Sequence, residues 1–416
     1  MKRSVVASLA IAILVAVVVG ALHATGLLVR FDHGVMEYIS HYRTATRVVG
    51  NKWQYVFILF FALVVAWMTV TTARRGRISW LVLILLAELI GVSWVCSLYR
   101  TFFQPLPAMA AVTLAFVAAH AWIYFSTRTR SHPVKTYFAG HLSNTQLGRL
   151  IEGEIPLDLD PRSLEVTVVV CDIANKYDLA EEADPAEFAE TTEAFIQRTT
   201  ELFLDAEGYI QAADGEGVVA VFGFPDASGN HADKAVRVTL GLVDSFRKAR
   251  QGSNGDLFGR CDVHMGVSSG TIIVAPLKDP ARPGLLTTGE PVELARRFCV
   301  ANRFYGSRVL IGPRTFELAS KHVVARPIDF LSGVNSQERH EIYEPLWLAA
   351  EAKPEHIARR DSFWNGVVLY REKRWAEAYT EFQKARGPDG EDEDAPLQLY
   401  LRRLETLALH LTTAPD

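Results

Sequence analysis

The 416-residue sequence predicts an α+β protein with a four-helix transmembrane anchor and C-terminal helices. Three observations support this fold class. Four runs of about 20 nearly uncharged residues lie in the first third of the chain. From residue 164 onward, strand and helix patterns alternate, with two hairpins inserted. Residues 358–416 have the periodicity of helices.

Each of the four apolar runs is long enough to cross a bilayer core of about 30 Å. They cover residues 4–22, 53–72, 78–99 and 106–126. The first run follows Lys2 and Arg3 and also resembles a signal peptide. Because its apolar stretch is long and no A-x-A-like site follows it, we favour a retained helix. We take residues 1–130 as the anchor.

Basic residues precede the first apolar run, separate the second from the third and follow the fourth. They are Lys2, Arg3, Arg74, Arg75, Arg77, Arg128, Arg130 and Lys135. Because Lys and Arg accumulate in cytoplasmic loops, we expect an integral protein of the inner or plasma membrane with both termini and the large C-terminal part in the cytoplasm. In the outer loop 23–52, the spacing of Val35, Met36, Ile39 and Tyr42 fits a short interfacial helix.

Glu88 lies in the middle of the third apolar run. An ionisable group at this depth costs a few kcal/mol unless it is paired or neutral. One interpretation is a sensing or proton-linked site. The simpler one is an interhelical hydrogen bond to His120 on the fourth run.

Charge divides the chain at the end of the anchor. Residues 1–130 hold 12 Lys and Arg against 3 Asp and Glu, and the remainder holds 31 against 44. The overall balance of −4 excludes a strongly basic nucleic-acid-binding protein, and the hydrophobic fraction of 49% excludes extensive disorder. The four cysteines contain no CxxC pair, so neither a disulfide framework nor a zinc site is expected.

Connector helices are expected over residues 131–163, where Phe138, Leu142, Leu147 and Leu150 have amphipathic spacing. A run of β-branched residues at 166–171 then predicts a buried strand that ends on Asp172. Further helices are expected at 185–204, 233–250 and 291–304, and a strand at 308–311. One hairpin is expected around 214–217 and another, joining strands 261–268 and 271–275, around 269–270.

Two carboxylates follow from this arrangement as candidate metal ligands. Asp172 closes the buried strand and Glu216 lies on the turn of the first hairpin. If these strands are neighbours, both groups lie at one edge of the sheet, beside backbone carbonyls such as that of Ile173. Hard oxygen ligands of this kind suit Mg²⁺ or Mn²⁺.

The motifs of residues 164–345 resemble those of class III nucleotidyl cyclases and occur in that family's order. The matching segments are 168–173, 215–223, 231–236, 265–270, 289–297 and 302–306. The resemblance implies a ferredoxin-like cyclase homology domain over residues 164–348. It also implies two bound metal ions, Mg²⁺ or Mn²⁺, held by Asp172, Ile173 and Glu216. Glu216 stands where Asp is usual in the family.

The resemblance also assigns catalytic and substrate-binding positions. Arg297 matches the family's transition-state arginine, which stabilises charge on the phosphoryl oxygens. Glu293 replaces the ribose-orienting asparagine and lies four residues before Arg297, so we hypothesise an ion pair between them. The two base-selecting positions fall on Ala212 and Leu286, where the family's Lys–Asp pair is absent.

In that family the site is shared between two chains, so a homodimer is implied. The resemblance predicts a membrane-bound cyclase that converts a nucleoside triphosphate, ATP or GTP with ATP favoured, to a 3′,5′-cyclic nucleotide and pyrophosphate for intracellular signalling. Because neither base-selecting residue is kept, the sequence leaves the choice between adenine and guanine open. The alternative is a catalytically impaired pseudo-cyclase that binds nucleotide or only dimerises. Ala212, Leu286 and Glu293 favour this alternative, whereas Asp172, Glu216 and Arg297 favour the enzyme.

Residues 349–416 resemble a tetratricopeptide helical hairpin. Gly366, Ala378, Phe382 and Ala385 have the corresponding spacing. Because a single repeat cannot bury its own faces, we expect these helices to dock on the cyclase-like domain or on the dimer mate. A packing element and a module for a protein partner are both compatible with this pattern.

Overall fold

The computed structural model describes residues 2–28, 30–32, 34, 47–72, 75–99, 101–251, 257–277, 284–334, 338–387 and 394–413. The chain forms two compact units, Met1–His132 and Pro133–Asp416. The predicted interfacial helix at Val35, Met36, Ile39 and Tyr42 lies outside the described residues.

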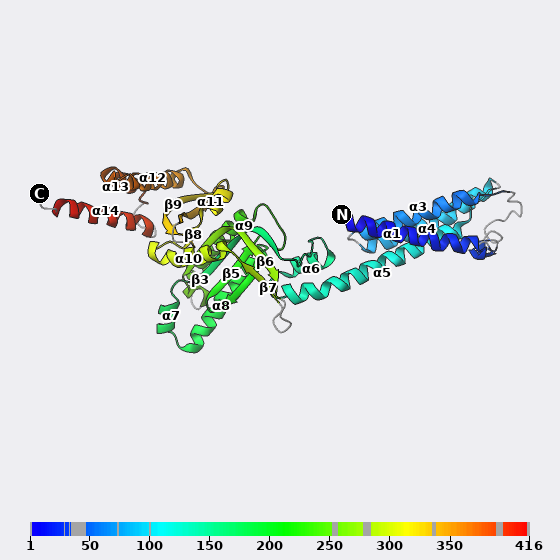
Figure 1. Cartoon of the computed structure of the whole chain (residues 1–416), viewed down its shortest axis with the longest axis horizontal. Coiled ribbons are helices and arrows are strands. Elements are labelled where there is room, and N and C mark those ends of the chain that lie inside the picture. Colours follow the sequence, from blue (N-terminus) through cyan, green and yellow to red (C-terminus); the bar gives the residue numbers. More distant parts are fainter. Residues whose placement is uncertain are drawn as a thin grey trace. The chain divides into compact units, whose positions relative to one another are not determined.

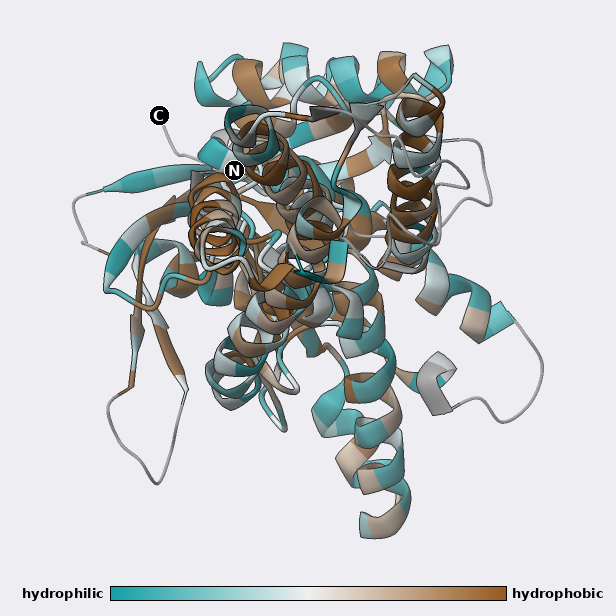
Figure 2. Ribbon diagram, turned by 90° about the vertical axis from the view of Figure 1, so that its right-hand side faces the viewer, coloured by the Kyte–Doolittle hydropathy of each residue, from teal (hydrophilic) through white to brown (hydrophobic). Residues whose placement is uncertain are grey.

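The N-terminal unit contains four helices that are long and apolar enough to cross a membrane. These are α1 (Lys2–Ala24), α3 (Asn51–Thr71), α4 (Arg75–Leu98) and α5 (Pro105–Phe138), and two short parallel strands accompany them, β1 (Arg47–Val48) and β2 (Thr101–Phe102). Small residues such as Ala62, Ala66 and Ala115 are fully buried between the helices, while Trp80 and Val117 are exposed. Close helix packing through small residues with an apolar exterior is typical of membrane helices, and Figure 2 shows these helices mostly in the hydrophobic colour.

Glu88 lies on the exposed side of α4. The ring Nδ1 of His120 lies 3.0 Å from the carbonyl oxygen of Phe116, one turn earlier on its own helix. The predicted hydrogen bond between Glu88 and His120 is therefore wrong for this structure, because His120 contacts its own helix and Glu88 faces away from the packed interior.

The second unit is built on an eight-stranded sheet (Figure 1). Its strands are β3 (Arg162–Ile173), β4 (Tyr209–Asp214), β5 (Gly217–Phe222), β6 (Val263–Pro276), β7 (Leu285–Thr288), β8 (Val309–Ile311), β9 (Val323–Ser332) and β10 (Arg339–Leu348). The order is β4-β5-β3-β6-β8-β10-β9, with β7 paired to β6. With α8 (Pro185–Asp205) and α9 (His231–Gln251) as the two crossovers, the first four strands form a split βαβ, or ferredoxin-like, core. The expected α+β class is confirmed.

Side chains of β3 alternate between two buried layers. Val169 and Cys171 pack with α8 and α9 on one face. Val168 and Val170 pack on the other face against α6 (Asn144–Glu152) and α10 (Glu290–Tyr305). A strand covered on both faces has no polar side to show, which explains its continuous run of apolar residues.

The prediction of a hairpin around residues 269–270 is wrong, because β6 continues through this segment as one strand. Ser269 and Gly270 keep their pairing with Thr167 and Val166 of β3. The Ser269 hydroxyl lies 2.7 Å from that of Thr167 and 2.9 Å from that of Thr315. Because these hydrogen bonds satisfy the Ser269 hydroxyl inside the domain, Ser269 can stay buried in the strand and does not require a solvent-exposed turn. The β9–β10 hairpin, in contrast, was not predicted.

The C-terminal helices dock on their own chain. They are α12 (Pro354–Arg371), α13 (Trp375–Lys384) and α14 (Ala395–Thr413). Their buried residues Phe363, Phe382 and Tyr400 form one cluster with Phe298 of α10 and Ile328 of β9. A Cβ on Gly366 would lie 2.8 Å from the Phe382 ring, so α12 and α13 run side by side at close range (Figure 1). The C-terminal helices therefore pack against the sheet domain of their own chain. Their identity as a tetratricopeptide hairpin stays a prediction.

A buried arginine ties this tail to the sheet. The Arg326 guanidinium donates two hydrogen bonds to Glu344, at 2.9 and 2.7 Å, and two to Asp394, at 2.6 and 2.7 Å. It also lies over the Phe363 ring at 4.3 Å from the centroid. Strands β9 and β10, helix α12 and the start of α14 therefore meet at this one side chain.

Replacing Arg326 by Met should lower the free energy of unfolding by about 3–5 kcal/mol, because it leaves two carboxylates without their cation in a buried setting. Chemical denaturation of the full chain in detergent micelles, followed by circular dichroism, measures this change. Arg314→Met is the matched control, since Arg314 pairs with Glu165 and Glu317 at the surface. Equal denaturation midpoints for the two variants would contradict this role of Arg326.

Candidate functional site

Asp172 and Glu216 lie at the same edge of the sheet. Strand β3 pairs with β5 in a register that places Cys171 opposite Val218. Asp172 is therefore next to Gly217, the residue that follows Glu216. Glu216 is on the exposed turn between β4 and β5, and its N–H donates to the Asp214 carboxylate at 2.9 Å.

Gly217 is what allows this approach. Its φ is +104°, and a Cβ on it would lie 2.3 Å from the carbonyl oxygen of Cys171. Only glycine tolerates both the backbone conformation and the contact. The turn carrying Glu216 is thereby held directly against the end of β3.

Lys176, at the start of α7 (Lys176–Glu182), contacts the same edge. Its Nζ lies 2.9 Å from Oδ1 and 3.2 Å from Oδ2 of Asp172, and it donates to the carbonyl oxygen of Gly215 at 2.9 Å. Asp172 Oδ1 also accepts the N–H of Ile173 at 2.8 Å. Sequence reasoning missed Lys176; its place four residues after Asp172 was the signal that could have found it.

The oxygen atoms at this edge are of the kind that bind a divalent cation. Two carboxylates, Asp172 and Glu216, with the Ile173 backbone next to them, are the oxygen ligands that Mg²⁺ and Mn²⁺ prefer. The Asp172 side chain is 32% exposed and so is accessible to an ion from solvent. The ammonium of Lys176 bonds to the same carboxylate oxygens.

Behind this edge the protein is apolar and holds two thiols. Burial, reinforced by the charge of Asp172, raises the pKa of Cys299 to about 12. Burial also raises the pKa of the Cys171 thiol, with the neighbouring Cys299 as the next cause. The Cys299 Sγ–H donates to the carbonyl oxygen of His264 at 3.2 Å. These thiols are neutral and act as packing groups, not as nucleophiles or thiolate ligands.

Helix α10 presents Glu293 and Arg297 on its exposed side. The Arg297 Nη1 donates to the carbonyl oxygens of Gly333, at 2.5 Å, and Ser332, at 3.4 Å, at the end of β9. Within the described ranges, Arg297 contacts neither Glu293 nor the two carboxylates at the β3 edge. The hypothesised ion pair with Glu293 is therefore not formed, because backbone carbonyls of the β9–β10 hairpin take the guanidinium instead.

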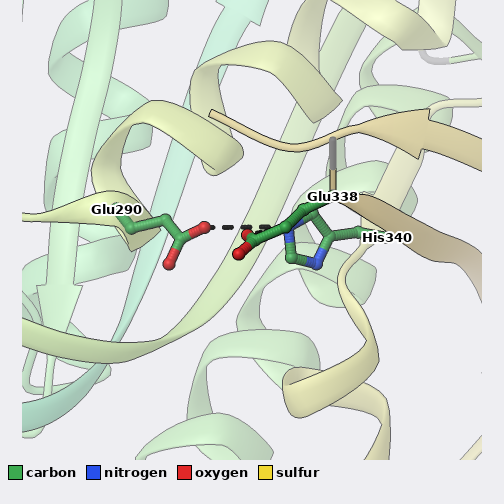
Figure 3. A group of neighbouring side chains, drawn as sticks. All are labelled: Glu290, Glu338 and His340. Carbon is green, nitrogen blue, oxygen red and sulfur yellow. Dashed lines mark ion pairs between the residues drawn. The ribbon is translucent and has the colours of Figure 1, made fainter. Parts of the chain in front are cut away.

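A second contact fixes this hairpin to α10. His340 on β10 places its Nε2 3.7 Å from Glu290 Oε1 and 3.9 Å from Glu338 Oε2, as Figure 3 shows. The Nε2 is buried and has no hydrogen-bond partner among the described atoms. Glu290 is the first residue of α10, so hairpin and helix meet at two points on either side of Glu293. No sequence signal joins positions 290 and 340, which are distant in the chain.

The two predicted base-selecting positions lie on strands that contact each other. Ala212 is on β4 and packs partly against the core, whereas Leu286 is on β7 and is exposed. The Gln211 side chain donates to the carbonyl oxygen of Thr287 at 3.0 Å and so bridges these strands. The Gln211 Oε1 and the Thr287 hydroxyl are buried and have no partner in the described part of the chain.

No family model matches this sequence. Among curated proteins, the chain is 24% identical over 193 residues to an uncharacterized protein of Mycobacterium tuberculosis, covering 46% of this chain and 32% of that protein. It is 25% identical over 183 residues to adenylate cyclase 1 of Rhizobium meliloti, covering 43% and 27%. The matched segment thus spans about a third or less of these relatives.

Similar solved structures include adenylyl and guanylyl cyclases. The adenylyl cyclase CyaB from P. aeruginosa is 20% identical with a TM-score of 0.41, covering 47% of this chain and 100% of that one. A bacterial light-regulated adenylyl cyclase is 17% identical with a TM-score of 0.43, covering 56% and 64%. The guanylyl cyclase Cya2 is 18% identical with a TM-score of 0.40, covering 47% and 98%.

Replacing Gly217 by Ala should destabilise the domain by about 1–3 kcal/mol, because the new methyl group meets backbone that cannot give way and the residue has an unfavourable positive φ. Thermal unfolding of the full chain in detergent measures this effect. Gly215→Ala is the control on the same turn, since a Cβ there meets nothing within 4 Å. Similar unfolding temperatures for both variants would show that Gly217 is not needed for the approach.

Proposed function

We propose that this chain is a membrane-bound class III nucleotidyl cyclase that converts a nucleoside triphosphate, with ATP expected over GTP, to a 3′,5′-cyclic nucleotide and pyrophosphate. The observation that carries the proposal is the sheet edge where Asp172, near the end of β3, lies next to Gly217, which directly follows Glu216 on the β4–β5 turn. This edge belongs to a ferredoxin-like core, and one of the curated relatives is adenylate cyclase 1 of Rhizobium meliloti.

In the proposed reaction the ribose 3′-hydroxyl attacks the α-phosphorus, the bond to the β-phosphate oxygen breaks, and pyrophosphate leaves with its electron pair. Asp172, the Ile173 backbone and Glu216 would hold two divalent ions. When bound, such ions lower the pKa of the attacking hydroxyl and neutralise the triphosphate. Asp172 is accessible from solvent, so the substrate phosphates could approach this edge.

Arg297 would stabilise negative charge on the phosphoryl oxygens. In the described contacts only its Nη1 donates to protein, and a guanidinium carries five N–H donors. The hairpin carbonyls therefore orient the side chain while leaving donors for a phosphate. Glu293, one turn away on the same exposed side, would accept a hydrogen bond from a ribose hydroxyl.

Base contacts in this proposal are weak. Ala212 and Leu286 offer only apolar surface to a purine ring. With no polar side chain at either position, discrimination between adenine and guanine rests on neighbouring groups such as Gln211 and Thr287.

A homodimer is part of this proposal: among the described residues, Asp172 and Glu216 do not contact Glu293 and Arg297, so a second chain would be needed to bring the two groups together. Helix α10 also exposes two large apolar side chains at i,i+4 spacing, Val300 at 74% and Phe304 at 66% exposure. Such a pair on a helix that borders a functional site indicates a surface covered by a partner. Glu88, on the exposed side of α4, would gain a partner in the same assembly.

The four apolar helices anchor the dimer in the membrane lipid, and we place the catalytic domains in the cytoplasm on the evidence of the basic flanks. The anchor keeps two domains at high effective concentration. The free sides of α12 and α13, which expose Val368 and Tyr379, remain the place where a protein partner would bind.

A pseudo-cyclase is the second candidate function. Three observations favour it: Glu293 adds negative charge where the triphosphate would lie, the base positions are apolar, and Lys176 bonds to Asp172. In this case the domain binds nucleotide or dimerises without turnover.

Asp172→Ala should lower cyclic nucleotide formation by about a hundredfold or more, because it removes a ligand of the ions that would activate the 3′-hydroxyl and neutralise the triphosphate. The assay uses the full chain in detergent with ATP and with GTP, each with Mg²⁺ and with Mn²⁺. Asp178→Ala, an exposed change of the same charge on α7, is the control and should retain activity. A wild-type protein without product under all four conditions would reject the enzyme in favour of the pseudo-cyclase.

Phe304→Glu should convert the proposed dimer to monomer, since it places a charge on the apolar side of α10. Light scattering on the full chain in detergent reports the mass, and cyclase activity should fall with it. Tyr379→Glu introduces the same charge on α13 and should leave the dimer intact. A Phe304→Glu protein with wild-type mass would rule out this surface as the interface.

A further inference from the structure

Lys176 places a positive charge against the carboxylate of Asp172, the proposed metal ligand. Its ammonium group donates hydrogen bonds to Asp172 Oδ2, at 3.2 Å, and to the carbonyl oxygen of Gly215, at 2.9 Å, and lies 2.9 Å from Asp172 Oδ1 as an ion pair. The group bridges the end of β3 and the turn that carries Glu216.

This contact differs from an ordinary surface ion pair. The Lys176 side chain is only 19% exposed, and it joins two segments that are far apart in sequence. It also starts α7, where a positive charge opposes the helix dipole. Its position is therefore explained by Asp172 and Gly215 and not by the local helix.

Both oxygens of Asp172 are consequently in use. Oδ1 accepts the N–H of Ile173 and lies within ion-pair distance of the Lys176 ammonium, and Oδ2 accepts a hydrogen bond from Lys176. A divalent ion that binds Asp172 must displace the ammonium or share the carboxylate with it at the cost of charge repulsion.

We propose that the Lys176 ammonium is a built-in cation of this edge that competes with Mg²⁺ or Mn²⁺ for Asp172 and thereby sets the affinity of the site. The inference rests on the proposed function in one respect, that Asp172 is a metal ligand. It adds a residue that controls when the ligand is free. With the divalent ion absent, Lys176 keeps the β4–β5 turn attached to β3; with the ion bound, Lys176 no longer bonds to Asp172.

The test is Mn²⁺ binding to the full chain in detergent, measured from the loss of the free-ion electron paramagnetic resonance signal. Lys176→Met should tighten binding by about tenfold or more, because a positive charge within hydrogen-bond distance of the ligand is removed. Lys176→Arg keeps the charge and should bind as wild type does. Lys234→Met is the matched control. Lys234 lies on α9, away from the site, and pairs there with Glu207.

The double variant Asp172→Ala, Lys176→Met should lose the gained affinity. A gain that persists in it would come from another acidic group, such as the Glu290, Glu338 and His340 cluster, and would overturn the proposal. Equal affinities for wild type and Lys176→Met, or no Mn²⁺ binding by either, would overturn it too.

A Mn²⁺-dependent rise in unfolding temperature provides a second readout if Lys176→Met is poorly stable. The rise should be larger in Lys176→Met than in wild type, since only the variant has an unpaired Asp172. Neither readout requires turnover, so a protein that makes no cyclic nucleotide still tests this inference.

Discussion

The pairing of β3 with both β5 and β6 is the constraint on which the rest of the structure depends. This strand is covered on each face, by α8 and α9 on one side and by α6 and α10 on the other. It therefore positions four helices at once. Its last residues also place Asp172 beside the β4–β5 turn. A shift of its register by one residue would exchange both core layers and separate Asp172 from the β4–β5 turn.

Helix α10 connects this core to the remainder of the domain. Its buried residues contribute to two separate clusters, with Val292 and Ala295 facing β3 and Phe298 facing the C-terminal helices. Its exposed side carries Glu293 and Arg297, and the β9–β10 hairpin contacts it at two points. The orientation of Arg297 thus depends on strands and helices that follow it by more than thirty residues.

Much of the fold was predictable because its signals are local. The four apolar runs and the buried strand at 166–171 each depend on a run of neighbouring residues, and all became the expected elements. The turn at 214–217 was predictable for the same reason. The second expected hairpin failed because Ser269 and Gly270 resemble a turn locally, whereas pairing with β3 and hydroxyl contacts to Thr167 and Thr315 keep the strand straight.

The sequence by itself determined the four long apolar helices, the buried strand at 166–171 and the turn at 214–217, since local composition and periodicity record them directly. The candidate residues on α10, β4 and β7 came from the resemblance to class III cyclases. Only the tertiary structure decided their partners. In the folded chain Asp172 pairs with Lys176, and Arg297 donates to the carbonyl oxygens of Ser332 and Gly333. His120 contacts a carbonyl oxygen of its own helix. Partner choice depends on which charged or polar groups meet when the chain is packed, and spacing along the sequence does not specify these distances.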